Sequence, residues 1–348
     1  MENAPQCVDT IDARGGFVTP GLIDAHCHLG IFGDSLGFEG SDGNEEVNPQ
    51  TPHLRAIDAL NPMDKCFEDA RKAGITSVVT GPGSTNVFGG QMAAIKTSGK
   101  RIDDMIIKAP CSMKCAFGEN PKRTGNGKNQ SPITRMATAA LFREAMYQAM
   151  SYDERIMDLE GENPVTDLKA EALLDVLKRR IPIHAHAHRA DDIFTAIRLA
   201  KEFNVDVKIV HASEGHLIAD ELAKENIDVM IGPLISVRSK PEMKNLNPQS
   251  AAILERSGVR LAITTDHPEV PIDHLLLCVQ LAVKDGMTAE GALQSVTCNA
   301  AEIAGIDDRV GKLKKGYDAD MVIFDKNPLD FGAKVLFTII DDVKVYKA

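Results

Sequence analysis

The chain has 348 residues, 43% of them hydrophobic, so it can bury a large core. Its net charge is −11 and no block of lysine and arginine stands out, which argues against a nucleic-acid-binding surface. The apolar runs are too short to span a membrane, and the amino terminus lacks the apolar run of a signal peptide. Seven scattered cysteines without a C-x-x-C pair indicate a reducing compartment. We therefore expect a cytoplasmic protein that acts on a small molecule.

Short apolar runs alternate with helical patterns from residue 22 to about residue 305. Strands are predicted at 22–25, 76–80, 181–186, 207–211, 229–231 and 261–265. Three further segments look extended, and two of them must supply the third and fourth strands: 92–96, 105–108 and 113–117. Helices are predicted at about 132–158, 166–179, 191–203 and 214–226. Repeated strand, turn and helix predict an α/β protein, a (β/α)8 TIM barrel with a parallel eight-stranded sheet.

The character of the sequence changes after residue 305. The segments 319–324 and 335–346 are rich in β-branched residues and hairpin-like, which predicts a small all-β appendage. Three polar loops are unusually long, at 30–56, 81–91 and 118–131. Long loops in a compact domain tend to be functional, so substrate contacts are expected there.

The first predicted strand leads into two histidines one residue apart. Alternation along a strand places His26 and His28 on one face and Cys27 on the other. Two neighbouring imidazoles can share one metal ion, and in a barrel such ligands belong at the carboxyl ends of the strands. An H-x-H tripeptide is by itself a weak signal, because most such histidines are structural or lie on the surface.

Three more predicted strands end on a residue that can bind metal. These residues are His186, His211 and Asp266. Neutral imidazoles combined with a carboxylate suit a divalent metal such as zinc. Because the carboxyl ends of parallel strands meet at one rim, the set predicts a metal site there and makes coincidence a poor explanation.

The whole chain resembles the amidohydrolase superfamily, in particular its imidazolonepropionase-like group. The stretches that carry this resemblance are 16–28 (GFVTPGLIDAHCH), 118–122 (GENPK), 186–192 (HAHRADD), 211–216 (HASEGH), 265–268 (TDHP), 299–305 (NAAEIAG) and 311–322 (GKLKKGYDADMV). Together these motifs are specific for the superfamily and much less so for a substrate. The resemblance implies a barrel at 18–305 and a small β-sandwich domain from 1–17 plus 306–348. Relatives usually carry more strands before the barrel, so the sandwich is expected to be reduced or truncated.

The resemblance also implies roles for individual residues. His26, His28, His186 and His211 would be metal ligands, with one or two ions bound. Asp266 would contact the metal and take the proton of the attacking water, and His211 would share the catalytic centre.

A second ion would need a bridging carboxylate, for which relatives use a carboxylated lysine or a glutamate. Lys114 and Glu119 are the candidates. Glu119 is preferred at this point, because it follows a strand end and needs no modification. Lys114 on the strand could equally be a solvated lysine or part of an ion pair.

Residues beside the predicted ligands are candidates for substrate binding: His188, Arg189, His216 and His267. Arg189 could instead pair with Asp191 or Asp192, which is the commoner fate of an arginine in such a run.

The predicted activity is metal-dependent hydrolysis of a C–N bond in an amide, cyclic amide or related substrate. A deaminase or a dipeptidase/prolidase-type hydrolase is the alternative within the superfamily. A non-catalytic barrel scaffold is the alternative of another class, and the filled ligand positions argue against it. Homo-oligomers are common in the family, so the resemblance also predicts one here.

Overall fold

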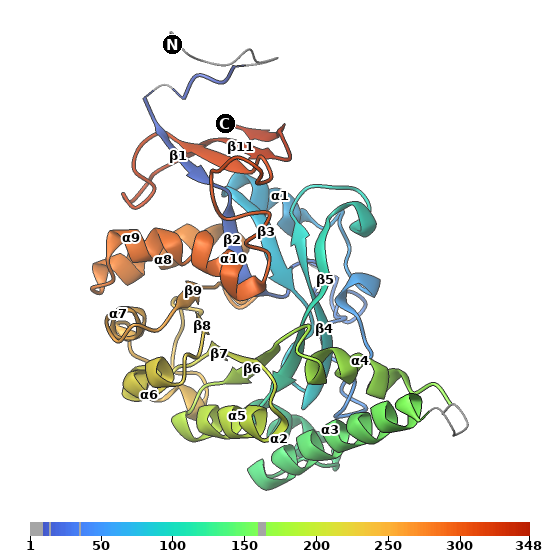
Figure 1. Cartoon of the computed structure of the whole chain (residues 1–348). Helices are drawn as coiled ribbons and strands as arrows, with labels where there is room; N and C mark the ends of the chain where they lie inside the picture. Colours follow the sequence, from blue (N-terminus) through green and yellow to red (C-terminus); the bar gives the residue numbers. More distant parts are fainter. Residues whose placement is uncertain (1–9, 14, 35, 159–164) are drawn as a thin grey trace.

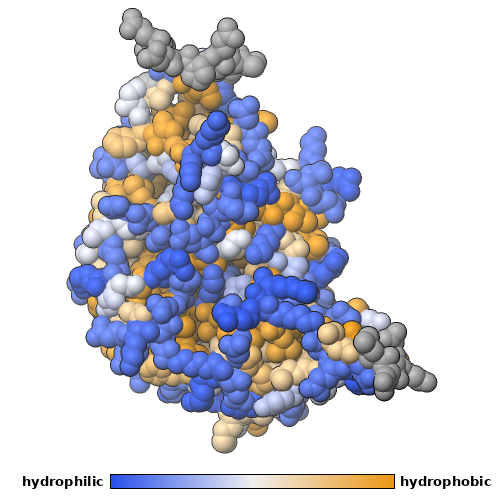
Figure 2. Space-filling view, viewed as in Figure 1, coloured by the Kyte–Doolittle hydropathy of each residue, from blue (hydrophilic) through white to orange (hydrophobic). Residues whose placement is uncertain are grey.

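The computed structural model describes residues 10–13, 15–34, 36–158 and 165–348. They form an eight-stranded sheet that curls into a nearly closed barrel, with helices around it, and a four-stranded sheet at one end (Figure 1). This confirms the predicted barrel class. Within the described part of the chain, we find no helix long and apolar enough to cross a bilayer. Hydrophilic side chains cover most of the face in Figure 2, with hydrophobic ones between them.

The barrel strands follow one another in chain order around the sheet. They are β2 (Leu22–Cys27), β3 (Ile75–Thr80), β4 (Phe88–Lys96), β5 (Ile106–Ala116), β6 (Ile183–Ala187), β7 (Val207–His211), β8 (Val229–Ile231) and β9 (Leu261–Ile263). The pair β2–β3 is parallel, as are all pairs from β5 to β9. The six residues of β2 and the six of β3 are all buried, as expected for strands covered on both faces.

The sheet departs from the expected all-parallel pattern at β4, which is antiparallel to both β3 and β5. No α-helix crosses over between these strands, and so short a connection can only reverse the chain. The predicted segments 105–108 and 113–117 are one strand, β5, and not two. The predicted loop 81–91 already contains the start of β4.

Ten α-helices are described. They are α1 (Lys65–Lys72), α2 (Glu119–Lys128), α3 (Arg135–Met157), α4 (Leu168–Leu177), α5 (Ala190–Phe203), α6 (Ala219–Lys224), α7 (Ser250–Arg256), α8 (Leu275–Lys284), α9 (Ala289–Gln294) and α10 (Cys298–Ala304). α5 buries the apolar face that its sequence predicted and ends at Asn204 in a left-handed conformation. The predicted helix at 214–226 is only a 3-10 turn followed by α6. The predicted loop 118–131 contains α2, a polar helix whose sequence lacks an apolar periodicity.

The small sheet has the order β1 (Phe17–Pro20), β10 (Met321–Phe324), β11 (Val335–Ile340) and β12 (Val343–Lys347), all antiparallel. A buried lysine of the barrel, Lys96 on β4, contacts three aspartates of the carboxyl-terminal segment. Its Nζ atom lies 2.6 Å from Asp320, 3.0 Å from Asp318 and 3.2 Å from Asp341. This cluster joins the small sheet to the barrel.

Candidate metal centre

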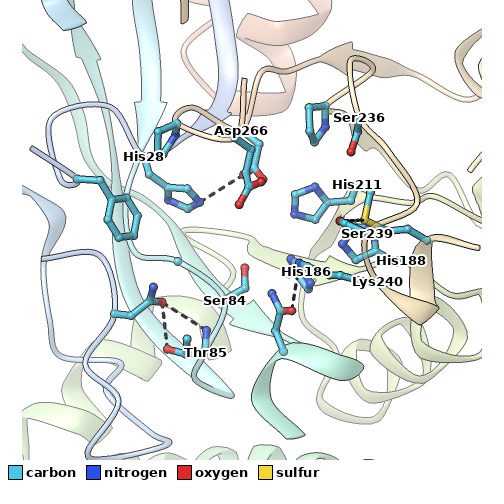
Figure 3. A pocket seen from close by; sticks show the side chains of 18 residues that line it. His28, Ser84, Thr85, His186, His188, His211, Ser236, Ser239, Lys240 and Asp266 are labelled. Atoms are coloured by element: carbon cyan, nitrogen blue, oxygen red, sulfur yellow. Dashed lines mark hydrogen bonds and ion pairs between the residues drawn. The ribbon is translucent and has the colours of Figure 1, made fainter. Parts of the chain in front are cut away.

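A cavity of about 350 Å³ lies at the carboxyl ends of the barrel strands. Five of its lining residues are possible metal ligands: His28, His186, His188, His211 and Asp266. In Figure 3, Asp266 lies between His28 on one side and His211 on the other, with His186 and His188 next to His211. The possible ligands form two groups in the described chain, namely His26, His28 and Asp266, and His186, His188 and His211.

The first group joins β2 to the segment that follows β9. The Oδ1 atom of Asp266 lies 3.3 Å from Nε2 of His28 and 3.7 Å from Nε2 of His26. The Nδ1 atom of His28 lies 2.7 Å from the carbonyl oxygen of Gly81, to which it donates. This hydrogen bond leaves the lone pair on Nε2, the atom that faces Asp266.

In the second group, one ligand atom of each histidine lies within 4.8 Å of the others. Nδ1 of His211 donates to the carbonyl oxygen of Gly232 at 2.8 Å, and Nδ1 of His188 lies 2.8 Å from Oγ of Ser213. The contact with a carbonyl oxygen leaves Nε2 of His211 available to a metal ion, and His188 has the same freedom when its Nδ1 donates to the Ser213 hydroxyl. Both ring nitrogens of His186 are buried without a hydrogen-bond partner among the described residues.

The electrostatics of both groups favour the charge states that bind metal. Burial lowers the pKa of His26, His186 and His211 well below the usual value, so these imidazoles are neutral. Burial alone would raise the pKa of Asp266, but His211, His28 and the Lys114 ammonium together hold that pKa below its usual range. Neutral imidazoles and an ionised carboxylate, with buried nitrogens left unpaired, fit a divalent cation.

Two of the possible ligands have a backbone conformation that is uncommon for a residue with a side chain. His211 has φ 75° and Asp266 has φ 54°, both in the left-handed region. Such conformations persist where the surrounding structure fixes them, and they cluster at functional sites.

Lys114 and Glu119 lie in different surroundings. Lys114 on β5 is fully buried, and its Nζ atom lies 2.9 Å from Nε2 of His26. Burial lowers its pKa to about 8. Glu119 begins α2 outside the metal-ligand groups and forms an ion pair with Arg123. The geometry thus brings Lys114 to the cluster and directs the carboxylate of Glu119, which the sequence favoured, toward Arg123.

The four predicted substrate-binding residues are placed differently as well. His188 lines the cavity. The Arg189 side chain pairs with Asp191 at 2.8 Å, which is the structural alternative considered for it. His216 lies 3.1 Å from Oγ of Ser250, and the His267 ring accepts a hydrogen bond from the Ile272 amide; neither lines the cavity.

Several polar lining residues were not selected from the sequence, among them Ser84, Asn120 and Lys240. Ser84 and Asn120 fall in two of the long loops, so the loops were the only available signal.

Asp24 is a further residue that the sequence analysis missed. Its buried carboxylate accepts hydrogen bonds from the Oγ1 atoms of Thr264 and Thr265, both at 2.6 Å, and from the amides of Thr265 and His26. Burial raises its pKa to about 6, and these hydrogen bonds act in the opposite direction. Asp24 therefore ties the strand that carries His26 to the segment that carries Asp266. Its position two residues before the H-x-H motif was the available signal.

The chain belongs to the amidohydrolase family, whose model matches residues 17–347. It is 25% identical to an imidazolonepropionase from Mesorhizobium japonicum, over 91% of this chain and 80% of that one. It is 29% identical to the amidohydrolase tasK from Hapsidospora irregularis, covering 97% of this chain but only 37% of the longer tasK. Relatives named imidazolonepropionase or adenine deaminase are hydrolases that act on C–N bonds, and the family generally binds divalent metals.

Among solved structures, an amidohydrolase from Thermotoga maritima MSB8 is 39% identical, with a TM-score of 0.96, and the match covers 100% of this chain and 92% of that one. A prolidase complexed with n-methylphosphonate-l-proline is 19% identical with a TM-score of 0.59, a likeness of fold alone.

Proposed function

We propose that this chain is a metal-dependent hydrolase that cleaves a C–N bond in an amide or cyclic amide, with zinc as the native metal. The observation that carries the proposal is the buried His26–His28–Asp266 group, of which His28 and Asp266 line the cavity. A structural cluster would satisfy its own hydrogen-bonding groups, whereas this site leaves the nitrogens of His186 unpaired.

A divalent cation bound there would supply Lewis-acid chemistry, activating water and polarising the scissile carbonyl. Asp266 is the proposed general base, and once protonated it would pass its proton to the leaving nitrogen. Its position beside both His28 and the cavity supports this role. His211, on the opposite side of Asp266 from His28, would hold a ligand position.

Lys114 is the proposed bridging residue. Its neutral amine would add to carbon dioxide and lose one proton, giving a carbamate that offers two oxygens in place of one nitrogen. Full burial and the 2.9 Å approach to His26 support this role, because an ammonium beside a metal ligand would oppose cation binding. The ion pair of Glu119 with Arg123 speaks against Glu119.

The test is metal analysis followed by substrate profiling. Protein purified without added metal is expected to hold one or two zinc ions per chain, and the His26→Ala variant fewer. The substrates should include N-acyl amino acids, cyclic amides, dipeptides and aminated heterocycles. A new amine with a carboxylate supports amide cleavage, whereas ammonia release indicates deamination.

The Asp266→Asn variant tests the mechanism. It should lose at least about 100-fold in kcat, in line with the loss of a general base. Full activity of this variant with metal still bound would overturn the proposed role of Asp266. No metal uptake by the unaltered chain, even after reconstitution, would favour a barrel scaffold over an enzyme.

A further inference from the structure

A second His-x-His segment faces a carboxylate of its own. His186 and His188 lie on one face at the end of β6, as His26 and His28 do at the end of β2. The Oε1 atom of Glu242 lies 3.8 Å from Nε2 of His186 and 3.7 Å from Nε2 of His188. The corresponding distances from Asp266 to the first pair are 3.7 and 3.3 Å. The same arrangement of two imidazoles and a carboxylate oxygen therefore occurs twice in the site.

Glu242 is held in place with one oxygen free. It belongs to a short 3-10 helix, Pro241–Met243, in the segment after β8, and is 1% exposed. Its Oε2 atom accepts a hydrogen bond from the amide of Glu119 at 2.9 Å. Its Oε1 atom, the one that faces the histidines, has no hydrogen-bond partner among the described residues.

The nearby cations are engaged elsewhere. Arg135 forms a bidentate pair with Asp192, at 2.8 and 2.9 Å. Nζ of Lys240 lies 3.3 Å from Oδ1 of Asn120, and no ion pair joins either cation to Glu242 in the described part of the chain. A buried carboxylate oxygen without a hydrogen-bond donor or a cation is costly, so a cation in front of Oε1 would offset a real penalty.

The spacing suits a divalent ion. With metal–ligand bonds of about 2.0–2.1 Å, the ligand atoms of a tetrahedral site lie roughly 3.4 Å apart. The distances from Oε1 of Glu242 to the two imidazoles exceed this value by a few tenths of an ångström. His211 contributes a third imidazole, whose ring centre lies 4.5 Å from that of His186 and 4.7 Å from that of His188.

We propose that Glu242 and His188 are ligands of a second divalent ion, together with His186 and His211. This inference rests on the proposed metal-dependent function and adds two ligands to it. Three imidazoles and a carboxylate suit zinc or a similar borderline metal. The second ion would then have a carboxylate ligand that is part of the sequence, so its binding would not depend on carboxylation of Lys114.

The experiment compares Glu242→Gln with Glu119→Gln, a matched change at a glutamate whose carboxylate pairs with Arg123. Each metal-free protein is titrated with Co²⁺ and then with Zn²⁺ against a chromophoric chelator, and bound metal is counted by elemental analysis. The unaltered chain and Glu119→Gln should bind two ions with equal affinity. Glu242→Gln should keep one ion unchanged and bind the other at least about tenfold more weakly, with altered visible Co²⁺ bands.

Two further variants keep the outcome interpretable. His188→Asn should lose the same ion as Glu242→Gln, and His26→Asn should lose the other one. In chelator, Glu242→Gln should unfold at the same temperature as the unaltered chain or higher, because it replaces a buried carboxylate whose Oε1 atom has no hydrogen-bond partner among the described residues. The proposal would be overturned if Glu242→Gln bound two ions with unaltered affinity. It would also be overturned if the unaltered chain bound only one ion and His26→Asn lost that ion. Only a chain that binds no ion at all would overturn the proposed function as well.

Discussion

The Nζ atom of Lys114 lies 2.9 Å from Nε2 of His26, although 88 positions separate the two residues in the chain. Both side chains are fully buried, and the charge of Lys114 acts on histidines of both metal-ligand groups. Each residue affects the charge state that the other can adopt. A lysine in this position is therefore either carboxylated or an obstacle to cation binding. Replacing Lys114 distinguishes these two possibilities by its effect on metal binding and activity.

Replacement of Lys114 by methionine tests the bridging role. We expect kcat to fall by at least about 100-fold while the fold persists, because methionine fills a similar buried volume. The ion held by His26 and His28 should bind more weakly, and the ion beside Glu242 should remain. Carbon-13 NMR of protein equilibrated with labelled bicarbonate should show a carbamate signal in the unaltered chain and none in the variant. Unchanged activity of Lys114→Met would remove Lys114 from the mechanism.

Replacement of Asp24 by asparagine tests the link between β2 and the segment after β9. The two oxygens of the Asp24 carboxylate accept four hydrogen bonds, whereas an asparagine side chain has a single acceptor oxygen. Donors of Thr264 and Thr265 therefore lose their partner in the variant. The free energy of unfolding should fall by about 1–3 kcal/mol, measured by chemical denaturation of the metal-free protein. Thr265→Val, which removes one of these donors, should cost about 1 kcal/mol. If Thr265→Val lowered the free energy of unfolding as much as Asp24→Asn does, the proposed role of Asp24 as the common acceptor would be contradicted.

Replacement of Lys96 by methionine tests how the small sheet is joined to the barrel. Removing the lysine takes the common cation away from buried Asp320 and half-buried Asp318, although Asp318 still pairs with Arg309. We expect a loss of about 3–5 kcal/mol in the free energy of unfolding. The control is Lys72→Met, which removes a solvent-exposed pair with Glu68 and should cost less than about 1 kcal/mol. Equal losses in the two variants would show that the buried cluster contributes no more than a surface pair.

The same cluster predicts how stability depends on pH. Burial acts to lower the pKa of Lys96, but Asp320, Asp318 and Asp341 outweigh it, so the pKa lies above its usual value. The folded state thus binds the proton more tightly than the unfolded state. The stabilisation by this lysine is complete below the unfolded pKa of about 10.4 and is lost as the pH rises through the folded value. Denaturation curves of the unaltered chain and Lys96→Met should converge at strongly alkaline pH, and a constant difference would contradict the assignment.

The barrel, and the polar residues that follow its strands, can be predicted from the amino-acid pattern alone. Apolar runs mark the buried strands, and the polar residues that close them, such as His26 and Asp266, could be read because the carboxyl ends of parallel strands share one rim. The direction of β4 could not be read, because an apolar run carries no information on whether its partner is parallel or antiparallel. The polar composition of 118–131 likewise concealed α2, a helix that its hydrophobic pattern does not reveal.

Which side chains share the site depends on contacts between segments that lie far apart in the chain. Lys114 and Glu119 are only five positions apart, so the sequence does not show which of them lies at the metal site. In the structure, Lys114 lies beside His26, whereas Glu119 pairs with Arg123. Glu242 gave no signal at all, because its neighbours in sequence are those of an ordinary loop glutamate. Its role arises from burial against two histidines of another strand, and burial is a property of packing between distant segments that no local periodicity encodes.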